Sequence, residues 1–265
     1  MSAEPTPAGL LAVAREAAAA GAAVLAGRPS GAIRVDTKSA AGDWVTDFDR
    51  RAEDAVRAVL RAARPDDEIT GEEYGTTVPE RPSGYRWSID PLDGTTNFVR
   101  GIVYYATSVA VSGPTPDGRR WLAGAVHAPA LGQEFYAGRG LGAWVREDAG
   151  ERRLTGPDPD SDAPLLGTGF GYDAGRRAFQ LEALGALLPG YANVRRIGSA
   201  ALDLCLVADG VLDAYAEYGT HVHDWSAGAL IAEEAGAAVV RPATTPGWSV
   251  AGRVDPAALP EPDGR

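Results

Sequence analysis

Two acidic residues, three positions apart where a strand meets a Gly-Thr turn, constrain this chain more than any other feature. Residues 85–89 alternate apolar and polar side chains, the pattern of a half-buried strand, so Asp90 is expected on the polar face where the strand ends. Pro91 and Gly94 predict a turn there, because Pro91 has no amide hydrogen and Gly94 allows backbone angles that a side chain blocks. The turn is expected to bring Asp93 back toward Asp90.

Converging carboxylates with no basic residue between them repel each other unless a cation intervenes. Oxygen ligands favour magnesium, calcium or manganese over zinc, and we expect Mg²⁺. Thr95 and Thr96 follow the two acids with hydroxyl groups and amides, at a position where a helix start can hold a phosphate oxygen. The alternative for an isolated Asp-x-x-Asp is an ordinary turn with an Asp or Thr cap.

The whole segment 87–98 resembles the first signature of the inositol monophosphatase family, whose members are magnesium-dependent and commonly lithium-sensitive phosphomonoesterases. Upstream, residues 71–73 resemble the family's Gly-Glu-Glu element, with Glu72 in the place of the metal-binding, water-activating glutamate. Lys38 and residues 43–49 resemble the family's Lys and Asp-x-Val-Thr-x-x-Asp elements. Asp49 takes the place of the acid that accepts a hydrogen bond from the motif threonine.

Downstream, residues 223–236 resemble the second signature, with Asp224 as the distant metal ligand. Shorter matches lie at 138–143 and 198–208, so the resemblance covers roughly residues 8 to 240 in family order. The chain departs from the pattern where His223 replaces the usual tryptophan before Asp224. The chain is also short beyond Val240, so the sequence does not predict whether the last strand and helix of the family fold are present.

The resemblance implies an α/β (α+β) fold, a layered α-β-α-β-α sandwich whose active site lies between two halves. Residues 154–164 are rich in breakers and lack periodicity, which predicts a linker. The halves are then residues 1–153, with the Gly-Glu-Glu and Asp-Pro-Leu-Asp-Gly-Thr motifs, and residues 165–265, with Asp224 and substrate contacts.

The same resemblance implies two or three magnesium ions. Glu72, Asp90 and the Leu92 carbonyl are expected to hold one ion, and Asp90, Asp93 and Asp224 a second; a third, weaker ion would lie near Glu72. Glu72 and Thr95 are expected to orient the attacking water, with Asp49 accepting a hydrogen bond from the threonine hydroxyl. The residues expected to bind phosphate or a polyol are Asp93, Gly94, Thr95, Thr96, Gly198, Ser199, Ala200, Glu217 and Asp224.

The expected reaction is hydrolysis of a small phosphate monoester, first of all myo-inositol monophosphate, by a metal-activated water. Histidinol phosphate, fructose 1,6-bisphosphate and a phosphoadenosine phosphate are alternative substrates, because relatives with the same metal motifs use each of them. A regulatory binding protein with incidental catalysis is a further alternative. The family also implies a homodimer.

Several single residues have a plain structural interpretation as well. Asp49 and Asp224 suit helix N-termini, where acids are favoured without any catalytic role. Lys38 could assist electrostatically or pair with Asp49 or Glu72, and Glu217 suits a solvated acid after a strand. The histidines, which lack the companion ligands of a zinc site, are expected to be structural or solvent-facing: His127, His221 and His223.

The amino-acid composition argues against some classes of binding partner. The 265 residues carry 36 acids against 25 bases, a net charge of −11, which argues against nucleic acid and against anionic membranes. Cys205 is the only cysteine, so internal disulfides and thiolate zinc clusters are excluded, and its apolar neighbours predict a buried position. The N-terminal segment resembles neither an export signal nor a membrane span, so a cytoplasmic location is expected.

Apolar spacing and end signals also predict the main elements. Helices are expected at 7–27, capped by Thr6, and at 46–63, 178–188, 199–208 and 226–235. Strands are expected at 85–89, 104–111, 121–127, 134–137, 143–145, 165–168 and 211–216.

Overall fold

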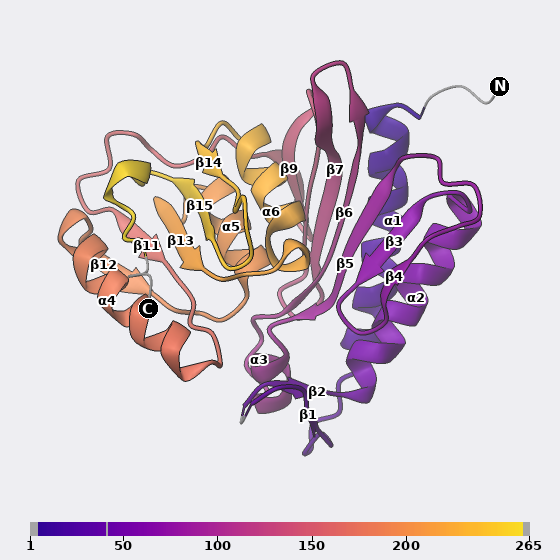
Figure 1. The fold of residues 1–265 in the computed structure, drawn as a ribbon, viewed down its shortest axis with the longest axis horizontal. Helices are drawn as coiled ribbons and strands as arrows, with labels where there is room; N and C mark the ends of the chain where they lie inside the picture. Colours follow the sequence, from indigo (N-terminus) through magenta and orange to yellow (C-terminus); the bar gives the residue numbers. More distant parts are fainter. Residues whose placement is uncertain (1–4, 41, 262–265) are drawn as a thin grey trace.

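The computed structural model describes residues 5–40 and 42–261, which form five layers, α-β-α-β-α (Figure 1). Helices α1 and α2 cover one face of an eight-stranded sheet, and α5 and α6 lie between this sheet and a five-stranded one. Helix α4 lies beyond the smaller sheet. The predicted layered sandwich is confirmed. The ends of the predicted halves, residues 1–4 and 262–265, lie outside the described residues, and the division at 154–164 stays a prediction.

The two N-terminal helices begin and end as their signals predict. Helix α1 (Pro7–Ala26) opens at a proline, and the Thr6 hydroxyl caps it by accepting from the Gly9 amide. Helix α2 (Asp47–Ala63) begins with a capping box between Thr46 and Asp49. Both helices pack on the large sheet, so they fix the outer face of the layer that carries the acidic motif.

By length and composition alone, α1 is apolar enough to cross a membrane. Buried core helices pass the same test, and Leu10, Ala14 and Ala18 of α1 pack with Val56 of α2 and Val109 of the sheet. The helix therefore serves here as part of the core.

The larger sheet has the order β10-β9-β8-β7-β6-β5-β3-β4. Its strands are β3 (Glu68–Gly71), β4 (Gly75–Thr77), β5 (Arg86–Asp93), β6 (Ala106–Thr115), β7 (Gly118–Ala128), β8 (Gln133–Gly138), β9 (Gly142–Glu147) and β10 (Gly150–Arg153). Only β3 and β5 run parallel, and β5 to β10 form an antiparallel meander. All five strands predicted from 85 to 145 are present, although β5 and β6 extend further toward the C-terminus than predicted. Strands β3, β4 and β10 were not predicted; every residue of β4 and β10 is exposed, so no apolar alternation marks those two.

The smaller sheet has the order β12-β11-β13-β15-β14. The elements of this part are β11 (Leu165–Gly167), α4 (Ala174–Leu187), a 3₁₀ turn (Leu188–Gly190), β12 (Asn193–Arg195), α5 (Ala200–Ala208), β13 (Ala214–Tyr218), α6 (Val222–Glu234), β14 (Val239–Val240), β15 (Trp248–Gly252) and a 3₁₀ turn (Pro256–Ala258). Strand β15 pairs with both β13 and β14, so the short C-terminal segment does supply a closing strand.

Three predicted boundaries in this part are wrong. Helix α4 begins at Ala174 rather than at residue 178, because the Asp173 carboxylate caps it by accepting from the Arg176 amide. Strand β13 is shifted toward the C-terminus and includes Glu217, and α6 begins at Val222 rather than at residue 226. Cys205 is fully buried in α5, as predicted.

Two small elements lie beside the end of β5. Strands β1 (Asp36–Thr37) and β2 (Trp44–Val45) form a hairpin, and α3 (Thr95–Arg100) follows the acidic motif directly. Figure 1 places both elements at the lower edge of the large sheet, where β5 ends.

Candidate active site

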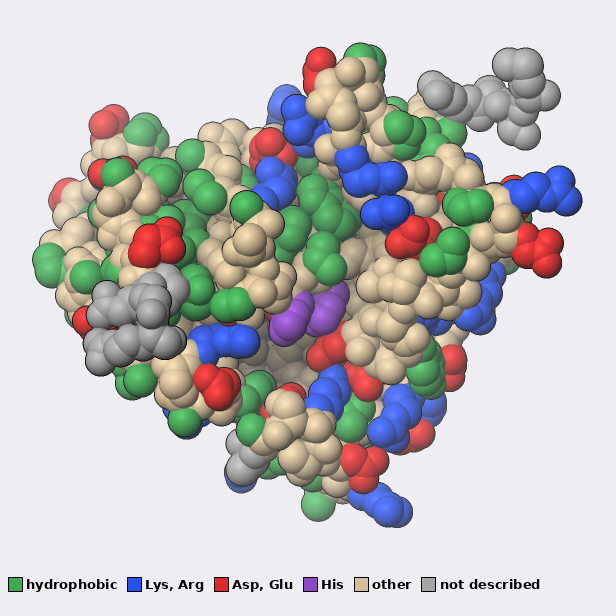
Figure 2. Space-filling model, in the orientation of Figure 1, with side chains coloured by type: hydrophobic (Ala, Val, Ile, Leu, Met, Phe, Trp, Pro, Cys, Tyr) green, Lys and Arg blue, Asp and Glu red, His purple; other side chains and the backbone are tan. Residues whose placement is uncertain are grey.

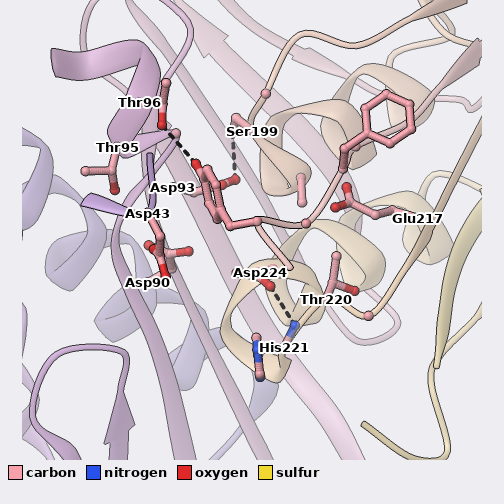
Figure 3. A pocket seen from close by; sticks show the side chains of 18 of the residues that line it. Asp43, Asp90, Asp93, Thr95, Thr96, Ser199, Glu217, Thr220, His221 and Asp224 are labelled. Carbon is pink, nitrogen blue, oxygen red and sulfur yellow. Dashed lines mark hydrogen bonds between the residues drawn. The ribbon is translucent and has the colours of Figure 1, made fainter. Parts of the chain in front are cut away.

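A cavity of about 500 Å³ lies where the end of β5 faces α6, β13 and the loop after β11 (Figure 3). Figure 2 shows this hollow with histidine side chains, in purple, at its wall. All but one of the predicted site residues line it: Glu72, Asp90, Leu92, Asp93, Gly94, Thr95, Thr96, Gly198, Ser199, Ala200, Glu217 and Asp224. The exception, Asp49, is buried behind Thr95.

The acidic motif lies within strand β5 rather than in a turn after it. The strand continues to Asp93 through a register shift that follows Asp90, so the predicted end at residue 90 is wrong. Pro91 falls inside this irregularity, where its missing donor breaks no regular ladder bond, and its carbonyl accepts from the Thr107 hydroxyl (2.9 Å). The backbone amide of Leu92 donates to Asp90 Oδ1 (3.0 Å), which fixes the first carboxylate.

Burial and mutual repulsion disfavour the charged forms of both motif acids. Burial raises the pKa of Asp90 well above its ordinary value, and the charges of Glu72, Asp93 and Asp224 raise it further. Burial and then Asp224 raise the pKa of Asp93 to about 7. A divalent cation at this place would offset the repulsion. We call Glu72, Asp90, Asp93 and Asp224 the carboxylate end of the cavity.

Helix α5 holds Asp93 from the other half of the chain. The Ser199 hydroxyl and the Ala201 amide both donate to Asp93 Oδ2, at 2.6 and 2.7 Å. The same hydroxyl accepts from the Leu202 amide as the helix cap, so it is already engaged on both sides. Ser199 therefore positions Asp93, and Asp93 Oδ1 makes no hydrogen bond within the described chain.

Glu72 follows β3 and contacts a lysine. Lys38 Nζ lies 2.7 Å from Glu72 Oε1 and also pairs with Glu73, so of the two predicted pairings the one with Glu72 is confirmed. Burial would raise the pKa of Glu72, but the charges of His223 and Lys38 lower it overall. Ligand atoms of Glu72, Asp90 and His223 all lie within 4.8 Å of one another, close enough to hold one metal ion.

The first turn of α6 brings Asp224 and its neighbours to the cavity. Asp224 is the third residue of the helix and not its cap; its Oδ2 accepts from the backbone amide of His221, the residue before the helix (2.6 Å; Figure 3). His223 Nε2 lies 3.3 Å from Asp224 Oδ1. His221 and His223 were expected to be structural or solvent-facing; His221 is exposed, and both residues also line the cavity. The available signal was adjacency, since residues beside Asp224 in one helical turn must follow it to the cavity.

Thr95 and Asp49 form the expected hydrogen bond. Thr95 Oγ1 lies 3.1 Å from Asp49 Oδ1 and 3.0 Å from the Leu92 carbonyl oxygen. Asp49 Oδ2 accepts from the amide and the hydroxyl of Thr46, at 2.7 and 2.6 Å, and so completes the cap of α2. Asp49 thus combines both proposed readings: one oxygen stabilises the helix, and the other faces Thr95.

Gly94 allows the chain to turn from β5 into α3. Its φ of +94° is left-handed, and a Cβ there would lie 2.9 Å from the Tyr104 carbonyl oxygen. Three residues on, the Asn97 side-chain amide donates to the carbonyls of Tyr104 (2.8 Å) and Ile197 (2.9 Å). The acidic motif is therefore tied directly to the loop that leads into α5.

Glu217 faces the cavity from β13, on the opposite side from Asp90 (Figure 3). The Tyr215 hydroxyl donates to Glu217 Oε2 (2.8 Å), and burial raises the pKa of Glu217 to about 7. A Cβ on Gly169 would lie 1.9 Å from this carboxylate, so only glycine fits beside it. Sequence reasoning missed the remaining residues of this side, which no motif marks; they include Tyr172, Arg176 and Arg196.

Comparisons with known proteins agree with the geometry. The model of the inositol monophosphatase family matches residues 7–261. The chain is 47% identical over 242 residues to the inositol-1-monophosphatase of Mycobacterium bovis, covering 89% of this chain and 80% of that protein. It is 38% identical over 204 residues to a protein of Pasteurella multocida named Nus factor SuhB, covering 77% and 73%. The solved structure of Mycobacterium tuberculosis SuhB superposes with a TM-score of 0.79 at 40% identity, covering 94% and 93%.

These matches confirm the family and the fold predicted from the motifs, and with them the enzyme class, a phosphoric monoester hydrolase. The matched region extends past the range in which motifs were recognised, so the short C-terminal segment belongs to the same fold. The chain belongs to the inositol monophosphatase family.

Proposed function

We propose that this protein hydrolyses a small phosphate monoester with the help of Mg²⁺, and that myo-inositol monophosphate is its first substrate. The observation that carries the proposal is the carboxylate end. Four acids from β5, α6 and the residue after β3 line one cavity, and each of the other three raises the pKa of Asp90 by its charge. Such a cluster is costly without a cation and is suited to hold one.

The donor set fits magnesium. The donors named for the ions are carboxylate oxygens and the Leu92 carbonyl, which hard cations prefer, and a ring nitrogen of His223 lies within 4.8 Å of ligand atoms of Glu72 and Asp90. Glu72, Asp90 and Leu92 would hold one ion, Asp90, Asp93 and Asp224 a second, and a third would lie near Glu72. When bound, Mg²⁺ supplies a Lewis acid for phosphate oxygens and lowers the pKa of a coordinated water.

The side chains beside this group would prepare the attacking water. Asp49 accepts a hydrogen bond from the Thr95 hydroxyl, so a lone pair of the threonine oxygen is free to accept a hydrogen bond from water in the cavity. Glu72 lies on the same side of the cavity and would accept a proton from the attacking water. Lys38 pairs with Glu72 and so keeps that carboxylate ionised and oriented.

The phosphate and its carrier would lie between the two sides of the cavity. The Gly94 and Thr95 amides, with the Thr96 hydroxyl, would hold phosphate oxygens, and Glu217 would accept hydrogen bonds from polyol hydroxyls. Gly198, Ala200 and the backbone of Ser199 would contact the carrier beside Asp93 and Asp224. Histidinol phosphate and the other phosphate esters named above remain alternatives, because the metals recognise phosphate and not its carrier.

The test is phosphate release from a panel of monoesters with and without Mg²⁺. We expect myo-inositol 1-phosphate to give the highest kcat/KM, no release in excess chelator, and inhibition by lithium. Phosphate release that persists in excess chelator would overturn the metal mechanism. A higher kcat/KM for histidinol phosphate would keep the hydrolysis and change the substrate, and insensitivity to lithium would count against the inositol subgroup.

The regulatory alternative has one observation in its favour, which is that relatives carry the name Nus factor SuhB. A pull-down with RNA polymerase, run with the wild-type protein and an inactive Asp90→Asn variant, separates binding from catalysis. The homodimer and the cytoplasmic location stay predictions.

A further inference from the structure

His223 lines the cavity, has no part in the proposed reaction, and stands where this chain departs from the family pattern. The residue usual at this position, directly before the aspartate of the second signature, is a tryptophan. An indole ring has one N–H group and can only donate, whereas a neutral imidazole has a nitrogen lone pair that can bind a metal ion. The replacement therefore adds a group able to coordinate a cation at the wall of the carboxylate end.

The first turn of α6 brings this imidazole close to two of the four acids. One ring nitrogen of His223 and one carboxylate oxygen each of Glu72 and Asp90 all lie within 4.8 Å of one another. Among the residues that the structure describes, this is the one group of three such side chains found so close together. Two ligands bound at about 2.2 Å on opposite sides of an ion lie about 4.4 Å apart, so the three atoms need to move little to share one ion.

The neighbours of His223 restrain its ring. Nε2 lies 3.3 Å from Asp224 Oδ1, and the His221 ring stacks on the imidazole, with ring centroids 5.5 Å apart and an angle of 13° between the planes. Trp225, two positions later, does not take the place of the missing tryptophan. It packs in the core, with its ring edge-on to Trp121. The imidazole therefore occupies its place at the cavity alone.

The nitrogens of His223 are not engaged elsewhere. Within residues 5–40 and 42–261, the imidazole makes no hydrogen bond, and its one ion-pair contact is the approach to Asp224, itself an acid of the carboxylate end. The other oxygen of Asp224 already accepts from the His221 backbone amide at 2.6 Å. The side chain of His223 is only 16% exposed, so its nitrogens are available mainly to what the cavity holds.

A nitrogen ligand among oxygen ligands changes which cations a site prefers. Mg²⁺ is a hard ion that is bound almost entirely through oxygen, whereas imidazole suits the first-row transition ions, whose affinity for such sites rises from Mn²⁺ onward. Carboxylates serve both kinds of ion, so the acids alone would leave the preference with Mg²⁺. The ring of His223 is the part of this group that distinguishes the two.

We propose that His223 is a ligand of the ion that Glu72 and Asp90 hold, and that it shifts the preference of this site from Mg²⁺ toward Mn²⁺ and the later first-row ions. The inference rests on the proposed metal-dependent function and concerns the choice of cation. Mg²⁺ still fits through the oxygen ligands, but it gains least from the imidazole.

The test uses Mn²⁺ as the probe, because electron spin echo modulation of bound Mn²⁺ detects the nitrogen of a coordinated imidazole. The metal-free full chain, without a histidine tag, receives a substoichiometric amount of Mn²⁺. We expect nitrogen modulation in wild type and none in His223→Gln, which keeps a polar side chain of similar reach without a ring nitrogen. In titrations of Mn²⁺ with Mg²⁺ as competitor, the Kd for Mn²⁺ relative to that for Mg²⁺ should rise about tenfold in this variant.

The variant His223→Trp, which restores the usual residue, should behave like His223→Gln. The chain has two other histidines, which supply matched controls. His127 lies on β7 and does not line the cavity, and His221 stacks on the ring without joining the group of three, so His127→Gln and His221→Gln should both keep the nitrogen modulation.

The inference is overturned if Mn²⁺ bound to the wild-type protein shows no nitrogen modulation, or if the modulation and the Kd ratio persist in His223→Gln. A wild-type protein that binds neither Mn²⁺ nor Mg²⁺ contradicts the proposed metal mechanism instead. The two failures are therefore distinguishable without any measurement of turnover.

Discussion

The two ends of the cavity are built in opposite ways. At the carboxylate end, Asp90 and Asp93 are short side chains on a central strand, almost without solvent exposure, and backbone amides fix both. The opposite side of the cavity, formed by Arg176, Arg196 and Glu217, we call the arginine end; Arg196 is a long, exposed side chain in a connection, and Arg176 is half-buried in a helix start. Four acids face a single lysine, Lys38, at the first end, whereas two arginines and one acid lie together at the second.

This difference suggests a division of roles. Rigid, desolvated acids of one sign suit ions whose position must be exact during the reaction. Longer side chains outside the large sheet suit recognition of a carrier, because they can change without disturbing the sheet that holds the acids. Substitutions at the carboxylate end should therefore reduce turnover, and those at the arginine end should change substrate preference.

The largest effect should come from Asp90→Asn, which is nearly isosteric and removes the charge at the centre of the acidic cluster. We expect kcat for any phosphate monoester to fall by at least about a thousandfold, because the loss acts on metal binding. Asp117→Asn, in the exposed turn between β6 and β7, serves as the control that should retain activity. A variant Asp90→Asn with half of the wild-type turnover would show that the carboxylate end is not the reacting centre.

A smaller loss should follow Thr95→Val, which keeps the β-branched shape and removes the hydroxyl that bonds to Asp49. We expect kcat to fall by about a hundredfold with little change in KM, since orientation of the attacking water is lost. Thr95→Ser restores the hydroxyl and should recover most of the rate. If valine and serine behave alike in steady-state kinetics, the hydroxyl has no role in the reaction.

At the arginine end, Glu217→Gln should act on binding instead. We expect KM for myo-inositol 1-phosphate to rise about tenfold, because a charged acceptor for polyol hydroxyls becomes neutral. With p-nitrophenyl phosphate, whose carrier has no hydroxyl groups, kcat/KM should stay close to that of wild type. The exposed Glu182→Gln of α4 is the matched control. Equal losses on both substrates would place Glu217 in the chemistry and remove the contrast between the two ends.

The sequence could predict a feature when the residues that determine it lie close together along the chain, and much less well when they lie far apart. Helix α2 and its capping box were predictable, because the apolar spacing, Thr46 and Asp49 all lie within one segment. The gathering of Glu72, Asp93 and Asp224 was not visible in any local pattern. It followed from the resemblance of several motifs to one family.

Other features could not be read from the sequence, because contacts between distant segments determine them. Helix α6 is an exception, because the bond from the His221 amide to the Asp224 carboxylate at its start is local, and adjacency to Asp224 indicated the position of the histidines. At the arginine end, Gly198 is only two residues from Arg196 in the chain, but Gly219 comes close to Arg176 only after folding. No spacing rule relates such residues in advance.

The smallest expected effect concerns stability and follows from the pKa of Asp93, which burial raises to about 7 from 3.8. A raised pKa in the folded state means that protonation favours folding, so this contribution is full below pH 4 and is lost as pH rises through 7. In chelator, the unfolding temperature should therefore fall between pH 5 and pH 8, by on the order of 5 °C. Glu217, with a pKa raised to about 7, acts in the same direction, whereas Glu72, whose pKa is lowered, acts only at more acidic pH.

The variant Asp93→Asn should reduce the fall of the unfolding temperature with pH. Added Mg²⁺ should stabilise the protein most at pH 8, where the carboxylates are charged. Thermal unfolding followed by circular dichroism at pH 5, 6, 7 and 8 measures both effects. An unfolding temperature that rises across this range without metal would mean that the carboxylate end is not repulsive, which removes the electrostatic contrast with the arginine end.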